Sequence, residues 1–440
     1  MQLTIEKLVY GGDGLARLPA DDKGPGKAVF VPFVIPGEKV EASLAENRRG
    51  FLRASLNRVL AASAERTEPG CPYFGHCGGC QYQHIEYAAQ LRYKTEILRE
   101  TLRRGAKLDL RAEIKIHAAE PWQYRNRTRI RVQHAPKFAL GYHRCASREV
   151  LPVERCPISS PLIHQAIEAV WTLGRNGHVP QRLHGLQFFA DHQDQQMLVE
   201  ACVQPGAGAR ECQSFAASLH QLLPAMVGVV VFASWSSEDE TRQYAPLSTV
   251  RAEPGQAIGE NALTYSAAGH DYRVSGGSFF QTNRFLVDEL LRTAIGNHKG
   301  RAALDLYAGA GLFTLPLSQR FDQVQAVEAS PHSFADLRHN APSNVKAIRA
   351  TTERFLAERA AKLAPDFVLV DPPRAGLGEK TARAMGRMSV PRVTYVSCDP
   401  ATLARDLLVL LESGFRVEEA HLLDLFPQTA HMETVLHLAR

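Results

Sequence analysis

The sequence predicts a multidomain α/β protein with an N-terminal β-barrel, a central α+β region and a C-terminal parallel sheet flanked by helices. Three observations lead to this prediction. The chain has 440 residues, 45% hydrophobic and 22% charged, which suffices for several globular cores. Short apolar runs broken by glycine and proline fill the first 62 residues. Strand-like and helical segments alternate regularly from about residue 301.

The N-terminal region is rich in turn residues. Gly11–Gly12–Asp13–Gly14 predicts a tight turn, and prolines separate the strand-like segments 28–31 and 39–42. Many short strands joined by such turns are typical of a small β-barrel. We therefore expect residues 1–62 to form the first domain, and the pattern alone gives this domain no function.

Charge and hydropathy limit the class of protein. The formal net charge of +5 permits nucleic-acid binding without arguing for it. Residues 1–7 lack the basic start and apolar run of a secretory signal, and no apolar stretch approaches the ~18 residues of a membrane span. We expect a cytoplasmic monomer that does not contact a membrane.

Three cysteines crowd into one short segment of the central region, with the spacing Cys71-x5-Cys77-x2-Cys80. The cytosol is reducing, so this spacing indicates a metal site and not a disulfide framework. Cys156 is the candidate for a fourth ligand. Four cysteines suit either zinc or an iron–sulfur cluster, and the spacing does not choose between them. Residues 87–104 follow as a predicted amphipathic helix.

Arginines then occupy every second position in one segment. If the segment is a strand, its period of two places all four on one face: Arg125, Arg127, Arg129 and Arg131. Four like charges on one face repel each other unless phosphates neutralise them, which predicts an RNA contact. A solvated face, or a set of partners for buried carboxylates, is the alternative interpretation.

A glycine-rich turn opens the regular C-terminal part. Residues 304–311 predict a strand that runs into the turn containing Gly309, and Glu328 ends the next strand. A carboxylate at that position can accept hydrogen bonds from both hydroxyls of a ribose. Thr314 replaces the third glycine of a dinucleotide-binding motif, which disfavours NAD. The pattern predicts an adenosine-containing ligand, with a plain β–α turn as the alternative.

Three further residues are candidates for chemistry at the same edge of the sheet. Asp371 precedes paired prolines, and Cys398 ends a strand just before a helix whose N-terminus should lower the pKa of its thiol. Glu433 precedes an apolar run and is a candidate desolvated base. A buried structural cysteine and an exposed glutamate are the alternatives.

Cysteine and base together suit methylation of a pyrimidine. A thiolate that adds to carbon 6 makes carbon 5 nucleophilic, and a base removes the carbon 5 proton after methyl transfer. The same logic serves uracil and cytosine, so the pair of residues does not identify the base.

Together these motifs resemble the RNA uracil-5-methyltransferases, a family of 23S rRNA and tRNA 5-methyluridine enzymes. The resemblance covers nearly the whole chain and rests on residues 70–81, 278–281, 305–311, 371–374, 397–400 and 431–433. It implies that Cys398 is the nucleophile and Glu433 the base. It also implies a pocket for S-adenosylmethionine and the target base, lined by Gln281, Tyr307, Gly309, Glu328 and Asp371.

The resemblance further implies a division into three domains. Residues 1–62 would form a TRAM domain, an RNA-binding barrel of OB type. Residues 63–262 would form a central iron–sulfur and RNA-binding domain. Residues 263–440 would form a Rossmann-like methyltransferase domain. The implied ligands of a 4Fe-4S cluster are Cys71, Cys77, Cys80 and Cys156.

Two departures from the family pattern and one open choice remain. Thr351 and Thr352 stand where an acidic or amide residue often lies near the adenine, and Leu312 replaces an asparagine of the glycine turn. The combination of a TRAM domain with four cysteines favours 23S rRNA over tRNA as the substrate. The sequence also leaves open an RNA cytosine-5-methyltransferase and a non-enzymatic RNA-binding protein.

Overall fold

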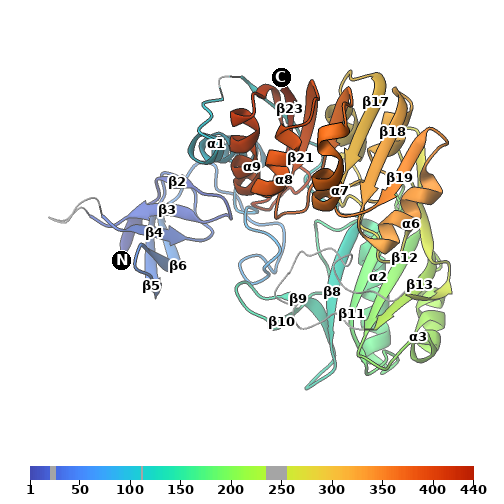
Figure 1. Ribbon diagram of the computed structural model, residues 1–440. Coiled ribbons are helices and arrows are strands. Elements are labelled where there is room, and N and C mark those ends of the chain that lie inside the picture. The colour runs from blue at the N-terminus through green and yellow to red at the C-terminus, as the bar shows by residue number, and fades with distance from the viewer. Residues whose placement is uncertain (20–25, 111, 234–254) are drawn as a thin grey trace.

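The computed structural model describes residues 1–19, 26–110, 112–233 and 255–440, and every structural statement below concerns these residues. Figure 1 shows three bodies: an N-terminal β-domain at one side, a central sheet, and a larger sheet with helices that contains the C-terminus. The structure is therefore mixed α/β with a separate N-terminal β-region, as the sequence predicts. No helix in the described part of the chain is long and apolar enough to cross a membrane.

The N-terminal β-domain, residues 1–61, is one six-stranded sheet in the order β1-β5-β6-β4-β3-β2. Its strands are β1 (Gln2–Thr4), β2 (Lys7–Leu8), β3 (Gly14–Arg17), β4 (Ala28–Val31), β5 (Lys39–Asn47) and β6 (Phe51–Ala61). Alternate residues enter the core, since Val29 and Val31 are fully buried while Phe30 is half-buried. The turn predicted at residues 11–14 joins β2 to β3.

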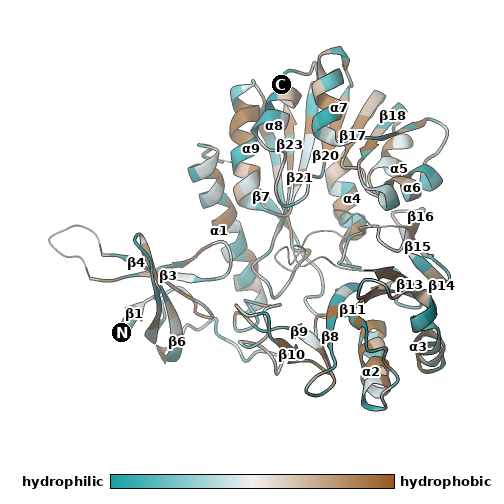
Figure 2. Ribbon diagram, turned by 60° about the horizontal axis from the view of Figure 1, so that its bottom comes forward, coloured by the Kyte–Doolittle hydropathy of each residue, from teal (hydrophilic) through white to brown (hydrophobic). Residues whose placement is uncertain are grey.

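The central sheet has seven strands in the order β10-β9-β8-β11-β12-β13-β14. They are β8 (Arg127–Gln133), β9 (Ala139–His143), β10 (Val150–Pro152), β11 (Leu183–Ala190), β12 (Met197–Val203), β13 (Met226–Ala233) and β14 (Gln256–Gly259). Hydrophobic residues dominate β11 and β13 because both faces are covered (Figure 2). Phe188 packs toward α2 (Pro161–Arg175) and α3 (Ala209–Leu222). Its neighbour Phe189 packs toward the hairpin β15 (Ala262–Ala267) and β16 (His270–Ser275).

The larger sheet, here called the catalytic sheet, has eight strands in the order β19-β18-β17-β20-β21-β23-β22-β7. They are β17 (Gly300–Leu306), β18 (Phe321–Glu328), β19 (Val345–Arg349), β20 (Phe367–Val370), β21 (Arg392–Ser397), β22 (Arg416–Leu423), β23 (Glu433–Ala439) and β7 (Ile114–His117). The strands expected near residues 303, 324, 367 and 393 are β17, β18, β20 and β21, and they are parallel. Only β23, among the described strands of this sheet, runs against its neighbours.

Helices accompany the strands of the catalytic sheet. They are α4 (Val287–Ile295), α5 (Thr314–Ser318), α6 (Pro331–Asn340), α7 (Thr352–Arg359), α8 (Glu379–Gly386) and α9 (Pro400–Glu412). The carboxyl ends of β17, β18, β20 and β21 lie at one edge, which is where ligands bind in sheets of this kind.

Two elements between residues 63 and 262 pack with the catalytic sheet. Helix α1 (Tyr87–Gly105) packs against α9, and its Ile97, Leu98 and Leu102 join the core beneath the catalytic sheet. Strand β7 pairs in parallel with β22 at the edge of that sheet. The apolar face of α1 requires a hydrophobic partner, and the catalytic core supplies it.

Candidate active site

The glycine turn after β17 has the backbone that a close ligand approach requires. Tyr307, Gly309 and Gly311 have φ angles of 61°, 58° and 97°, in the left-handed region that glycine adopts readily. The Gly309 N–H donates to the carboxylate of Glu328 at 2.8 Å, and Ser330 N–H donates to its other oxygen at 2.6 Å. Burial raises the pKa of Glu328. Its oxygens keep lone pairs that can accept further hydrogen bonds.

Two aspartates lie at the carboxyl ends of neighbouring strands: Asp305 is fully buried in β17, and Asp371, which follows β20, is half-buried. Burial raises the pKa of Asp371 to about 7, and the nearby charge of Asp305 contributes to this rise. Burial also raises the pKa of Asp305 to about 7, although Thr314 donates a hydrogen bond to it at 2.5 Å. Thr314 is the residue that interrupts the dinucleotide motif, and its hydroxyl stabilises Asp305 where a glycine could not.

Cys398 lies between β21 and α9, where the sequence predicts it. Asp399 caps α9, because its Oδ1 accepts from the backbone N–H groups of Ala401 and Thr402 at 3.0 Å each. The predicted lowering of the thiol pKa is wrong for this structure. Burial raises the pKa of Cys398, and the carboxylate of Glu433 raises it further. Desolvation disfavours the charged thiolate, and the neighbouring carboxylate repels it.

Glu433 begins β23 and is only 3% exposed, so it is not the exposed strand-end glutamate of the alternative interpretation. Burial raises its pKa well above the ordinary value, and the charge of Asp371 adds to this effect. Like charges in a dry site resist ionising together. Cys398, Glu433 and Asp371 therefore oppose one another's ionisation.

Arg374 is the cation of this group, and it was not among the side chains that the sequence pattern singled out for chemistry. Its charge lowers the pKa of both Cys398 and Glu433, although burial outweighs it at each. Arg374 also lies 3.3 Å from the ring nitrogens of His431. The sequence could have indicated Arg374 by its place directly after the paired prolines. A rigid loop that fixes Asp371 also fixes the side chain that follows the prolines.

Gln281 lies on the segment between β16 and α4 and is almost fully buried. Its neighbours Ser278, Phe279 and Thr282 line a cavity that the cysteines also line, and His431, which contacts Arg374, lines it as well. The loop therefore connects the two parts of the site. Thr351 caps α7, and the hydroxyl of Tyr307 donates to Glu353 in the same helix at 3.0 Å.

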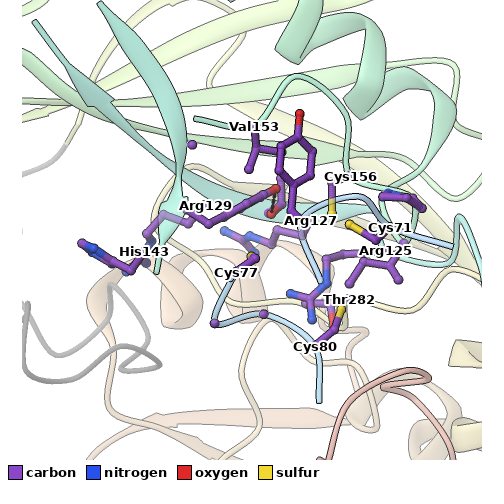
Figure 3. A pocket seen from close by; sticks show the side chains of 18 of the residues that line it. Cys71, Cys77, Cys80, Arg125, Arg127, Arg129, His143, Val153, Cys156 and Thr282 are labelled. Atoms are coloured by element: carbon purple, nitrogen blue, oxygen red, sulfur yellow. Dashed lines mark hydrogen bonds between the residues drawn. The ribbon is translucent and has the colours of Figure 1, made fainter. Parts of the chain in front are cut away.

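The four predicted cysteine ligands line one cavity of about 290 Å³ (Figure 3). Burial raises the pKa of Cys71, Cys77 and Cys80, and the nearby Cys156 raises all three further. The thiols thus lie close enough to interact electrostatically. Among the described residues, no three histidine, cysteine or acidic side chains are arranged to hold a single metal ion.

The alternating arginines line the same cavity: Arg125, Arg127, Arg129 and Arg131. Only the last three lie in β8, since Arg125 precedes that strand. Arg127 is 7% exposed and donates to the buried carboxylate of Glu200 at 2.8 Å. It is a partner of a buried carboxylate, so the prediction that it faces RNA phosphates is corrected. Arg129 is half-buried and lies 3.5 Å from Gln187.

Two families match the sequence of this chain. The family described as tRNA (Uracil-5-)-methyltransferase matches residues 256–440, and the TRAM domain matches residues 1–56. Among curated proteins, the 23S rRNA (uracil(1939)-C(5))-methyltransferase of Chromohalobacter salexigens is 32% identical over all of this chain and 89% of its own length. The enzyme of that name from Klebsiella pneumoniae is 31% identical over 100% of this chain and 95% of its own length. An uncharacterized RNA methyltransferase of Aquifex aeolicus is 30% identical over 99% of this chain and 97% of its own length.

A solved structure has a similar fold over its whole length. The Pyrococcus abyssi tRNA (uracil-54, C5)-methyltransferase in complex with S-adenosyl-L-homocysteine matches with a TM-score of 0.75, and the match covers 100% of both chains. The two sequences are 22% identical, so the likeness concerns the fold.

Proposed function

The chain belongs to the RNA uracil-5-methyltransferase family, and we propose from this premise that it methylates carbon 5 of one uridine in 23S rRNA. The observation that carries the choice of RNA is full-length similarity of 31–32% to enzymes named for that substrate. The tRNA enzyme shares the fold at 22% identity, which makes tRNA the second candidate.

The geometry supports one order of events at the target base. The thiolate of Cys398 adds to carbon 6 of the uracil, which makes carbon 5 nucleophilic. S-adenosylmethionine, when bound, supplies the methyl group and a positive charge. Glu433 then takes the proton from carbon 5, and Cys398 leaves as the double bond forms again. The raised pKa of Glu433 suits this role, because a carboxylate in a buried site is a stronger base than one in water.

The glycine turn is the proposed place for the methyl donor. Glu328 would accept hydrogen bonds from the ribose hydroxyls, while Gly309 lets the backbone approach the ligand. Tyr307, Asp371 and Gln281 would complete the pocket between this turn and the Cys398 group. The lone pairs left on Glu328 after its two backbone hydrogen bonds support the ribose contact.

We assign a 4Fe-4S cluster to the cavity lined by Cys71, Cys77, Cys80 and Cys156. A tetrahedral zinc ion holds its sulfurs at about 2.3 Å, which requires the four thiols to converge on one point. The four cysteines form part of the lining of a cavity of about 290 Å³, and no three such side chains among the described residues converge on one point, which favours a cluster of several atoms. Four thiolates would repel each other, and the irons would neutralise them. Four protein ligands saturate the cluster, so its role would be structural.

RNA would bind across the N-terminal β-domain and at arginines of β8. Arg129 and Arg131 are the candidates, because both are half-buried and line the cavity, whereas Arg127 is 7% exposed and neutralises Glu200. An arginine at a cavity edge can bind a phosphate with paired hydrogen bonds.

The test is methyl transfer from labelled S-adenosylmethionine to unmodified 23S rRNA and tRNA transcripts, side by side, with a Cys398→Ala control. We expect label in rRNA, lost in the variant. Label in tRNA alone would keep the chemistry and overturn the substrate. Label that survives the loss of Cys398 would overturn the assignment of the nucleophile.

A further inference from the structure

The turn between β2 and β3 reaches from the N-terminal β-domain to the residue beside Cys398. The hydroxyl of Tyr10 donates to Oδ2 of Asp399 at 3.0 Å, a contact between positions 389 apart in the chain. The ring of Tyr10 packs against the core of the catalytic sheet. The sequence around Tyr10 does not predict this contact.

The turn itself is shaped for close approach. Gly12 has a φ of 100°, and its N–H donates to Val9 at 3.1 Å. A side chain at Gly12 would lie 2.8 Å from Gln81 and 3.3 Å from Ala430. Gln81 follows the cysteine segment directly, and Ala430 precedes Glu433 by three positions. The turn therefore packs closely against two loops, the one that contains Gln81 and the one that contains Ala430.

Asp399 connects Tyr10 to the nucleophile. Its Oδ1 accepts from the first N–H groups of α9, and its Oδ2 accepts from Tyr10. The carboxylate is therefore held from two directions, by a helix of the catalytic sheet and by the N-terminal β-domain. Because Asp399 is bonded to Cys398 through one peptide group, fixing its side chain also fixes the direction of the thiol.

We propose that Tyr10 is a positioning residue for the nucleophile, by which the N-terminal β-domain holds the Cys398 loop in the geometry for attack on carbon 6. The proposal rests on the proposed role of Cys398. It also gives the N-terminal β-domain a second task beyond binding RNA, since the Tyr10 hydroxyl holds the side chain next to the nucleophile.

Tyr10→Phe tests the proposal, because it removes only the hydroxyl. A matched control is Glu100→Ala, which breaks another contact of the same β-domain, the 2.5 Å ion pair between Lys7 and α1, far from Asp399 in the chain. Both variants of the whole chain are assayed on the RNA that the wild type methylates. We measure kcat, KM for RNA, and the pH dependence of kcat/KM.

We expect Tyr10→Phe to lower kcat about 10-fold, as the loss of a hydrogen bond to a charged group would, with KM for RNA unchanged. The rise of kcat/KM with pH should move to higher pH, because Asp399 without its donor opposes the Cys398 thiolate more strongly. Glu100→Ala should change neither quantity. A change in KM alone, or an equal loss in both variants, would mean that Tyr10 merely docks the domain and would overturn the proposal. A wild type whose methylation does not need Cys398 would instead overturn the proposed function.

Discussion

Replacement of Lys94 by Met should destabilise the protein strongly. Lys94 and Asp424 are both 0% exposed, and their charged groups lie 2.6 Å apart. At that distance, an effective dielectric constant of about 20 gives an attraction of about 6 kcal/mol. Desolvation of the two ions offsets much of this attraction. Loss of one partner alone leaves a buried charge without compensation, which costs about 3–5 kcal/mol. Lys94 Nζ also donates to the carbonyl of Phe426 at 3.0 Å.

Thermal unfolding at neutral pH measures this cost. For a unit of about 150–250 residues, each kcal/mol moves the midpoint by roughly 2–4 °C, so we expect Lys94→Met to lower Tm by about 6–20 °C. Arg383→Met is the control, since it breaks an exposed pair with Glu379 at 2.9 Å and should cost less than about 1 kcal/mol. The double variant Lys94→Met with Asp424→Leu should recover most of the loss. A double variant no more stable than Lys94→Met would refute the argument from an uncompensated charge.

Four other predictions concern the site, the cavity beside it and the buried histidines. Glu433→Gln should still allow Cys398 to add to the uracil but should prevent its release, so a covalent protein–RNA complex should persist on a denaturing gel. Absence of this complex from a variant that still binds RNA would contradict the role of Glu433 as the base. Arg129→Ala should reduce the slope of log affinity for RNA against log salt concentration by about 1. Arg127→Ala should instead lower Tm, because it leaves Glu200 unpaired. Equal salt slopes for the wild type and Arg129→Ala would exclude a phosphate contact at Arg129. Burial lowers the pKa of His84, His298 and His421 to about 4. Each of these histidines therefore binds more protons in the unfolded chain between about pH 6.5 and 4, so a His84→Gln variant should gain Tm relative to the wild type as the pH falls through that range. A difference in Tm that stays constant between about pH 7 and 5 would contradict this. Cys156→Ser should lower the iron and sulfide content of anaerobically purified protein, and equal content would exclude Cys156 as a ligand.

The sequence was most informative where chain order alone brings residues together. Strands that alternate with helices form a parallel sheet, and their carboxyl ends share one edge. Gly309, Glu328, Asp371 and Cys398 could therefore be placed together without coordinates. The cysteine cavity could be anticipated as well, because three of its four thiols are neighbours in sequence.

Other features depend on contacts that the sequence does not indicate. Glu200 neutralises Arg127 because β8 and β12 both flank β11, and nothing near Arg127 predicts that pairing. The pKa of Cys398 depends on burial and on Glu433, which lies 35 positions away in a different strand. The contact of Tyr10 with Asp399 spans most of the chain. Tertiary packing determines each of these features.

Strand β7 also affects how the protein can be made. Ile114 pairs with Ala420, so the ribosome must add about 300 residues before β7 has its partner. At roughly 5–20 residues per second, this takes about 15–60 s. During that time Ile116, which remains 45% exposed even in the folded chain, lies on an unpaired strand that other chains can bind. The catalytic sheet can be completed only near the end of synthesis. Chaperones should therefore bind at β7 more than at the N-terminal β-domain, whose strands pair within the first 61 residues.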